Sequence, residues 1–292
     1  MTLYIRTSII IPTRNNEGTI FSTLKSVFDE IQANDEVIVV LNGSTDNTET
    51  IINQFSNDSR LKIIFSEPGR SRARNSGLHI AGGEFINFLD SDDEFIKGHV
   101  SRATNFLDNN PSYFAFADES LICQRDNKTK ISIPYTDQIN VHDLINTNIF
   151  EIASVVFRNR HIVYFLDSLE FNEDHIFWIE NLLHKKVYFQ KQVGSQKKIT
   201  GQNTMLNYRS EMIGTRIVIS AILQRDYGII VEPNFFKTSW NIIKFLKCKA
   251  HLHQDLRALL YSEYKYQYLF ASVLIHLPIF KFLIANRLKN HG

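Results

Sequence analysis

Short apolar runs alternate with helical segments over the N-terminal part of the chain. Four runs end abruptly at polar residues, which is typical of buried strands: 7–11, 37–41, 61–65 and 85–89. The segments between them are predicted helices: 19–32, 48–55 and 70–81. An alternating order of strands and helices predicts right-handed crossovers and a parallel sheet with helices on both faces.

Polar loops follow three of these predicted strands. They span residues 12–18, 42–46 and 90–94. The carboxyl ends of parallel strands meet at one edge of a sheet, which is where ligands bind in such folds. We therefore expect the three loops to converge on one site.

The rest of the chain predicts a more mixed arrangement. The expected helices are 99–107, one starting at 143–146, one opening at Glu173-Asp174, and 213–227, 240–246 and 252–268. The expected strands are 113–117, 120–125, 152–157 and 187–189, with a hairpin turn at 126–128 and a polar loop at 194–198. The strands would complete the sheet, and the last helices would form a separate extension.

Composition is that of an ordinary globular protein, but charge is divided unevenly. The 292 residues are 43% hydrophobic and carry a formal net charge of +1. Residues 1–236 hold 23 Lys and Arg against 29 Asp and Glu, whereas 237–292 hold nine against two. A basic tail predicts a negatively charged partner, which is either membrane lipid or nucleic acid; we expect lipid and no nucleic acid.

Two features bear on the compartment. Cys123 and Cys248 lie far apart without metal-binding or redox spacing, which fits a reducing environment. The apolar run near the N-terminus is too short for the hydrophobic region of a signal peptide. We therefore expect a cytoplasmic protein.

The fourth predicted strand runs directly into three carboxylates, Asp90, Asp92 and Asp93. Desolvating ionised carboxylates is costly and like charges repel, so a cationic partner is needed if they are buried. Mg²⁺ or Mn²⁺ meets this need with oxygen ligands and usually bridges to phosphates. The alternative is a solvated acidic turn.

Three arginines precede this strand at alternate positions, Arg70, Arg72 and Arg74, and glycines flank them. They open a predicted helix, whose first turn offers free N–H groups and the positive end of its dipole. Arginine adds bidentate contacts to phosphate oxygens. The alternative is a solvated basic face, but the nearby acidic loop favours phosphate binding.

Four blocks in a fixed order resemble a known family. The segments SIIIPTRNNEGTI, VIVVLNGSTDNT, GRSRARNSGLHIAGG and EFINFLDSDDEF are similar to the nucleotide-sugar half of the GT-A glycosyltransferases of family two. The resemblance is strong over residues 7–118. It implies a GT-A, Rossmann-like mixed sheet flanked by helices, here with a helical C-terminal extension.

The resemblance implies roles for residues at the predicted edge. Asp92 would coordinate a divalent cation, Mn²⁺ or Mg²⁺, that bridges the donor diphosphate. Asp90 would face the ribose or share the metal. Pro12, Thr13 and Glu17 would line the base and ribose pocket.

The arginine segment and the second loop complete the implied donor site. Arg70, Arg74 and Asn75 would lie beside the diphosphate. Two aspartates typical of the family are replaced by Leu41 and Asn42, and one of them usually meets the base. Asn42 can still accept a hydrogen bond through its carbonyl oxygen.

The resemblance also implies a catalytic base and a basic group on the acceptor side. Asp174, in an acidic pair that opens a helix, would take the proton of the acceptor hydroxyl. A carboxylate at a helix start is stabilised as the anion, as a base requires. The alternative is an N-cap. Lys197 or Lys198 could lie near the diphosphate, and the alternative is that neither does.

The C-terminal segment 265–292 is aromatic and basic, but Pro278 and Lys281 interrupt its apolar run. A membrane span needs about twenty apolar residues, so an interfacial amphipathic element is the better interpretation. The protein would then be peripheral on the inner face of the cell membrane. Alternatively the segment packs on the catalytic domain or on a second subunit of a homo-oligomer.

The sequence therefore predicts an inverting, metal-dependent glycosyltransferase of bacterial surface polysaccharide synthesis. Its donor would be a nucleotide-diphosphate sugar and its acceptor a glycan or lipid-linked hydroxyl. We expect a catalytic domain over 1–210, with a nucleotide-sugar half at 1–118 and an acceptor half at 119–210, and an extension over 211–292. The alternatives are a sugar nucleotidyltransferase and a non-catalytic nucleotide- or carbohydrate-binding scaffold.

Overall fold

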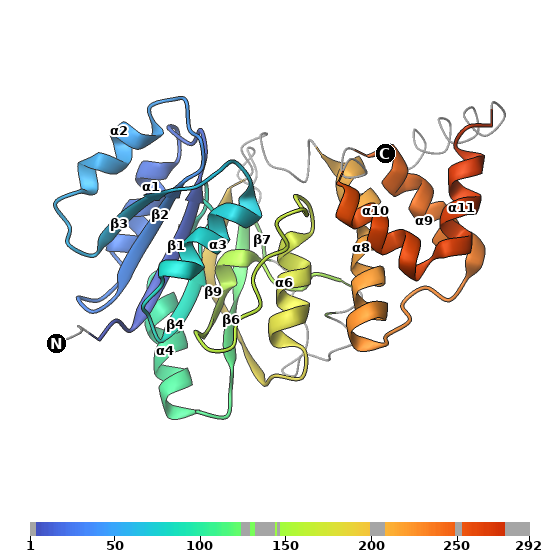
Figure 1. Cartoon of the computed structure of the whole chain (residues 1–292). Coiled ribbons are helices and arrows are strands. Elements are labelled where there is room, and N and C mark those ends of the chain that lie inside the picture. Colours follow the sequence, from blue (N-terminus) through green and yellow to red (C-terminus); the bar gives the residue numbers. More distant parts are fainter. Residues whose placement is uncertain are drawn as a thin grey trace. The chain divides into compact units, whose positions relative to one another are not determined.

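The computed structural model describes residues 4–123, 129–131, 144, 147–198, 208–248 and 253–277 (Figure 1). The predicted turn at 126–128, most of 143–146 and the segment after Leu277 lie outside these residues. The chain forms two compact units. One comprises Met1–Asp167 with Glu173–Gly201, and the other Ser168–Asn172 with Gln202–Gly292. The predicted division at residue 210 stays a prediction.

A mixed sheet is the centre of the first unit. Its parallel part consists of β1 (Thr7–Thr13), β2 (Glu36–Leu41), β3 (Leu61–Phe65) and β4 (Phe85–Phe88). The sheet continues through β8 (Val155–Arg158), β6 (Ala115–Cys123), β9 (Val187–Lys198) and β5 (Glu94–Phe95), while β7 (Thr129–Ile131) pairs with β6. The strand order is β3-β2-β1-β4-β8-β6-β9-β5. This confirms the predicted α/β fold class.

Helices cover both faces of the parallel part of the sheet, and β1 is therefore buried on both sides. Ile9 and Ile11 share a core with α1 (Ile20–Phe28) and α2 (Thr48–Ile52), which 3-10 helix η1 (Asn53–Phe55) follows. On the opposite face α3 (Arg70–Ile80) packs over Ile10. A Cβ added to Gly77 of α3 would lie 2.4 Å from Ile10 Cγ2, so only glycine permits this approach.

Three further elements complete the first unit: α4 (His99–Asn109), the 3-10 helix η2 (Ile152–Ser154) and α6 (Glu173–Leu182). Two expectations were wrong here. The predicted strands 113–117 and 120–125 are not separate, because β6 runs without a break from Ala115 to Cys123 while 124–125 lie outside the described residues, and residues 194–198 form the end of β9 instead of a loop. Polar residues 194–198 stay extended because β6 and β5 hydrogen-bond to β9 on both sides.

The second unit is helical, with α8 (Arg209–Tyr227), α9 (Phe235–Lys247), α10 (Gln254–Glu263) and α11 (Lys265–Leu274). Gly228, in the left-handed region at φ 66°, ends α8, and the Asn234 side chain caps α9 by accepting from Lys237 N at 3.0 Å. The predicted helix 252–268 is interrupted at Tyr264. Among the described residues, no helix is both long and apolar enough to cross a bilayer.

Candidate active site

The acidic turn after β4 is fixed against α1 and the preceding loop. Asp93 N donates to Asp90 O at 3.0 Å, which closes the turn. The Ser91 carbonyl accepts from the hydroxyls of Thr19 and Thr23 at 2.9 and 3.0 Å. The turn therefore presents its side chains from a well-defined position at the carboxyl end of the strand.

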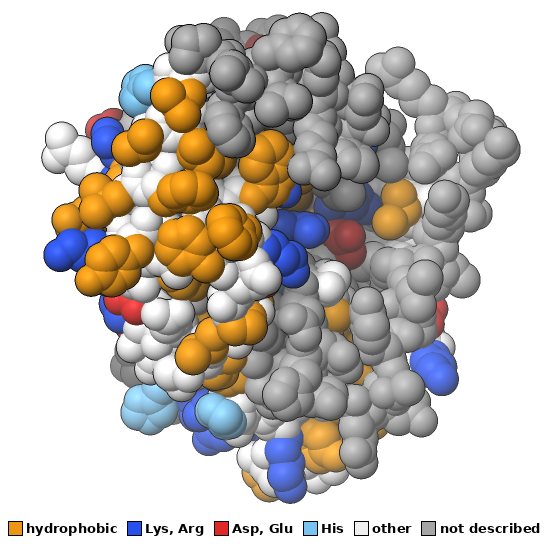
Figure 2. All heavy atoms as spheres, turned by 90° about the vertical axis from the view of Figure 1, so that its right-hand side faces the viewer, with side chains coloured by type: hydrophobic (Ala, Val, Ile, Leu, Met, Phe, Trp, Pro, Cys, Tyr) orange, Lys and Arg blue, Asp and Glu red, His pale blue; other side chains and the backbone are white. Residues whose placement is uncertain are grey.

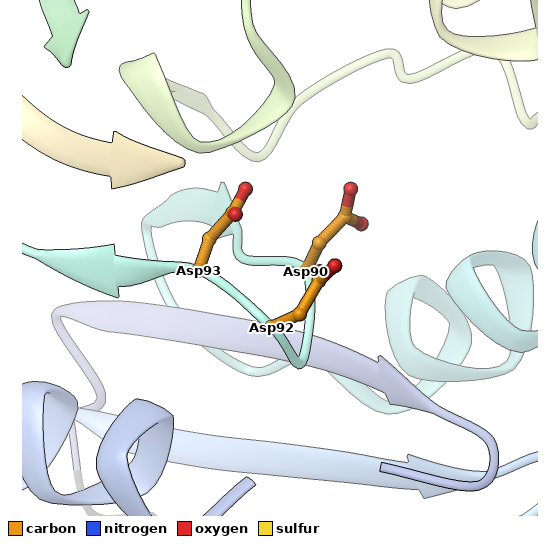
Figure 3. Close-up of side chains that lie close together, drawn as sticks. All are labelled: Asp90, Asp92 and Asp93. Carbon is orange, nitrogen blue, oxygen red and sulfur yellow. The ribbon is translucent and has the colours of Figure 1, made fainter. Parts of the chain in front are cut away.

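Asp90, Asp92 and Asp93 all come from this one turn (Figure 3), and each offers a carboxylate oxygen within 4.8 Å of the others. Burial and then the Asp90 charge raise the pKa of Asp92, and the same two causes raise the pKa of Asp93 well above its usual value. Burial opposes ionisation of Asp90 too, but Arg74 and Arg70 hold its pKa below the usual range. The protein thus compensates one of the three charges much better than the other two.

Arg74 joins the acidic turn to α6. Its guanidinium donates to Asp90 Oδ1 at 2.8 Å and to Glu173 Oε1 at 2.9 Å. The Arg74 and Glu173 side chains are only 2% and 3% exposed. Arg70 reaches the same Glu173 oxygen at 3.4 Å, and the Phe165 ring lies 5.3 Å from Arg74 Cζ. A buried network of charges therefore sets the spacing between α3, the turn and α6.

Asp174 lies in the first turn of α6. Its Oδ2 accepts from Asn148 Nδ2 at 2.8 Å, and its Oδ1 accepts from His175 N at 2.9 Å. Burial and then the Glu173 charge raise the pKa of Asp174 to about 6, against the opposing effect of Arg74. The carboxylate is therefore ionised at neutral pH but holds a proton more readily than an exposed aspartate.

Lys197 brings a cation to the same site from β9. Its Nζ lies 2.7 Å from Glu151 Oε2. Burial opposes its charge, but Glu151 and then Asp93 outweigh that effect and raise the pKa of Lys197. Lys198 pairs instead with Glu94. Of the two lysines that the sequence left open, Lys197 is the one whose ammonium charge acts on the acidic turn, whereas Lys198 contacts Asp93 through its backbone N–H, which donates to Asp93 Oδ1 at 3.3 Å.

The loops after β1 and β2 are hydrogen-bonded to each other. Glu17 Oε2 accepts from Asn47 N and Nδ2 at 3.0 and 2.9 Å, and Asn15 Oδ1 accepts from Thr45 N at 2.8 Å. Ser91 donates its hydroxyl to Asn16 Oδ1 at 2.8 Å. These bonds confirm the expected convergence of the three polar loops at one edge of the sheet.

Six carboxylates and three cations form the described charge cluster at this edge: Asp90, Asp92, Asp93, Glu151, Glu173 and Asp174, with Arg70, Arg74 and Lys197. Negative charge exceeds positive charge within it. An arrangement of this kind favours binding of an additional cation, and its oxygen ligands are those that Mg²⁺ and Mn²⁺ accept.

Residues 8–163 match the family model for glycosyl transferase family 2, which is more than half of the chain. The chain belongs to glycosyltransferase family 2. It is 38% identical over 117 residues to an Escherichia coli protein described as UDP-Glc:alpha-D-GlcNAc-diphosphoundecaprenol beta-1,3-glucosyltransferase WfgD, covering 39% of this chain and 46% of that one. The chain therefore matches less than half the length of this relative.

A longer but weaker match involves the Campylobacter jejuni GalNAc(5)-diNAcBac-PP-undecaprenol beta-1,3-glucosyltransferase. It is 24% identical and covers 97% of this chain and 94% of that one. Among solved structures, Staphylococcus aureus TarS 1–349 in complex with UDP-GlcNAc has a TM-score of 0.63 at 21% identity, covering 94% of this chain and 82% of that one. The Pyrobaculum calidifontis mannosyltransferase PcManGT with GDP-Man and Mn²⁺ has a TM-score of 0.59 at 17% identity, covering 95% and 88%. These structural matches show the GT-A fold.

Several residues that the family resemblance placed at the donor have structural contacts in this family 2 chain. Asn42 is buried and holds Gly69 through two bonds, accepting from its N–H at 3.2 Å and donating to its carbonyl at 3.3 Å. Asn75 donates to Phe165 O at 2.9 Å and accepts from Phe165 N at 2.9 Å. Pro12 and Thr13 are buried within β1. Their roles in base or diphosphate binding stay predictions.

Three site residues were not assigned a role from the sequence: Asn148, Glu151 and Glu173. The sequence shows Glu173 as one half of the acidic pair that opens α6. It does not show that Glu173 is buried against Arg74. Asn148 and Glu151 precede η2 without a recognisable pattern, and their contacts with Asp174 and Lys197 join residues 26 and 46 positions apart. No local sequence signal reports such contacts.

Proposed function

We propose that this family 2 chain is an inverting glycosyltransferase that moves a sugar from a nucleotide-diphosphate donor to a hydroxyl of a lipid-linked acceptor in bacterial surface polysaccharide synthesis. The observation that carries the proposal is the pairing of two features at one sheet edge. One is the acidic turn of Asp90, Asp92 and Asp93, and the other is Asp174, which is ionised at neutral pH.

Asp92 and Asp90, with Asp93 beside them, would hold Mn²⁺ or Mg²⁺. Three carboxylate oxygens within 4.8 Å, two of them on groups with raised pKa values, fit a hard divalent cation. When bound, the cation would stabilise the negative charge on the departing diphosphate. Arg70 and Lys197 keep their positive charge in this site and would supplement that role from the protein side.

Asp174 would act as the base. Asn148 donates to one carboxylate oxygen and the α6 backbone to the other, so the group is held in one orientation. The acceptor oxygen forms a bond to the anomeric carbon while the bond from that carbon to the diphosphate oxygen breaks. The acceptor proton passes to Asp174, and the single displacement inverts the anomeric centre.

The finer assignment of donor and acceptor rests on the relatives. Relatives from E. coli are described as using UDP-glucose and a diphosphoundecaprenol-linked GlcNAc. We propose a UDP-hexose donor and an undecaprenol-linked acceptor for this chain. Asn42 stands where the family usually has an aspartate and already bonds Gly69, so we propose that groups in the loop around Glu17 also contribute to contact with the base.

A product assay tests the reaction type. The protein is incubated with Mn²⁺, a panel of UDP- and GDP-sugars and undecaprenyl-diphosphate-GlcNAc, and the lipid and nucleotide products are identified by mass spectrometry. We expect one added hexose and a nucleoside diphosphate. Release of pyrophosphate would identify a nucleotidyltransferase instead, and no turnover on any donor would favour a binding scaffold.

Two substitutions separate donor binding from catalysis. Asp174→Asn should lower kcat by about 10²–10⁴-fold while the stabilisation by Mn²⁺ and nucleoside diphosphate in thermal unfolding is kept. Asp92→Asn should remove that stabilisation together with activity. Turnover like that of the wild type in both variants would contradict the proposal.

A contact with the anionic membrane surface would bring the enzyme to such an acceptor, and we propose that α9 and α11 make it. Phe270 of α11 packs its ring on Phe235 and Phe236 of α9, with centroids 5.6 and 6.3 Å apart. Phe236 and Tyr266 are 72% and 74% exposed. Figure 2 shows hydrophobic side chains gathered on part of this face with Lys and Arg among them, which supports an interfacial role.

A further inference from the structure

A hollow lies at the sheet edge opposite the acidic turn. Strand β8 runs antiparallel to β4, so Arg158 at its end pairs with Phe85, the first residue of β4. Strand β9 begins beside the first residue of β6 at the same edge. The segments after β8, before β9 and before β6 line an open hollow of about 370 Å³. Its lining consists of Ser112, Phe114, Arg160, His161, His184, Lys185 and Lys186, called here the cationic pocket.

The cationic pocket has no acidic lining residue. Within the described parts of the chain, Arg160, Lys185 and Lys186 form no ion pair, and all three are exposed. This uncompensated charge lies in a part of the chain where acids outnumber bases, 29 to 23 over residues 1–236. Basic runs are usually solvated, but here two separate segments turn their charges into one concavity.

Backbone contacts hold the two segments in place. Lys186 O accepts from Phe114 N at 2.8 Å, and Phe114 O accepts from Arg158 N at 3.0 Å. Asn181 of α6 accepts from Val163 N and donates to Val163 O, both at 2.9 Å. The pocket's backbone is thereby held by the sheet and by the end of α6.

Both pocket histidines have an unfavourable backbone conformation. His161 and His184 lie in the left-handed region at φ 53° and 63°. Among the described non-glycine residues only Asn15, in the loop after β1, and Asn172 share this property. Such conformations persist where surrounding structure enforces them and are concentrated at binding sites.

We propose that the cationic pocket binds a phosphate group. Arg160 offers a planar fork of donors for two phosphate oxygens, and Lys185 and Lys186 offer point charges. The phosphate can come from a free anion or from the headgroup of a phosphomonoester lipid, since both present the same dianion. The site is independent of the acidic turn, needs no metal and does not rest on the proposed transferase activity.

Titration of the full chain with inorganic phosphate, in EDTA and at low ionic strength, tests the site by calorimetry. EDTA keeps metal-dependent binding at the acidic turn out of the measurement. The test variant is the triple substitution Arg160→Gln, Lys185→Gln and Lys186→Gln. The variant removes all three positive charges of the pocket, so we expect phosphate affinity to fall by about tenfold or more.

A matched control removes the same charge elsewhere on the first unit through Lys25→Gln, Lys97→Gln and Lys191→Gln, all exposed. This control should bind phosphate within about twofold of the wild type. Thermal unfolding of each variant checks that the fold is kept. Equal losses in the two triple variants would overturn the proposal because the effect would then reflect net charge alone.

Vesicle sedimentation distinguishes the two phosphate sources. Vesicles of phosphatidylcholine with phosphatidic acid are compared with vesicles in which phosphatidylglycerol supplies an equal charge. Preference for phosphatidic acid that the pocket variant loses and the control keeps assigns the site to a lipid headgroup. Phosphate binding without that preference assigns it to a free anion, and absence of both refutes the site.

Discussion

At the scale of single residues, the environment of Asp174 makes a pH dependence testable. A base works only when ionised, and burial followed by the Glu173 charge raises the pKa of Asp174 to about 6. The ionised fraction is lost as pH falls through that value. We therefore expect kcat/KM, measured between about pH 5 and pH 8, to fall by about tenfold per unit below about pH 6.

The fall in kcat/KM below about pH 6, called here the acidic limb, can be assigned to Asp174 by changing its hydrogen-bond partner Asn148. Asn148→Asp places a second carboxylate where the amide now donates to Asp174 Oδ2 at 2.8 Å. The like charge should raise the pKa further and move the limb to higher pH. As a control, Asn109→Asp adds the same charge at an exposed position of α4 and should leave the acidic limb in place. An unmoved limb in the Asn148 variant would assign it to another group.

At the scale of elements, Arg74 links α3, the acidic turn and α6 through a part-buried bond to Asp90 and a buried bond to Glu173. Arg74→Met would leave Glu173, 3% exposed, without this partner. Removing one member of a buried ion pair typically costs about 3–5 kcal/mol because the other charge stays desolvated. We expect a loss of that size in the free energy of unfolding measured with urea.

The same helix offers the control for this substitution. Arg72 is exposed and donates to Pro68 O at 3.2 Å. Arg72→Met should therefore change the unfolding free energy by less than about 1 kcal/mol. A second Glu173→Gln substitution should restore part of the stability lost in Arg74→Met. Similar losses for Arg72→Met and Arg74→Met would show that the buried link does not hold these elements together.

Sequence patterns predict elements well where the reason for them is local. Strands β1, β2 and β4 are buried on both faces, so each is a mainly apolar run followed by a polar loop. Strand β5 has two residues, and the polar end of β9 is extended only because β6 and β5 flank it. The acidic turn, Arg74 and Asp174 were predicted as site residues, whereas Glu151 was not because its position depends on β9.

At the scale of the whole chain, two charge patterns accompany two compact units. The first unit combines an acidic site at one sheet edge with the cationic pocket at the other. The second unit contains most of the basic C-terminal segment, in which nine Lys and Arg oppose two acids from Lys237 onward. The sequence reveals the second imbalance and the acidic turn, but not the cationic pocket, because residues from distant segments build that pocket.

The membrane contact proposed for α9 and α11 predicts a loss of vesicle binding when exposed aromatic groups are removed. Phe236→Ser with Tyr266→Ser removes side chains that are 72% and 74% exposed. Burying such a group in a bilayer contributes about 1.5–3 kcal/mol, so sedimentation with phosphatidylglycerol vesicles should weaken by about tenfold or more. Tyr4→Ser with Phe65→Ser removes a matched pair, 60% and 69% exposed, from the first unit and should leave binding unchanged. Equal binding by both double variants would show that α9 and α11 do not face the membrane, because a bilayer contact through them depends on the apolar area that only the first variant loses.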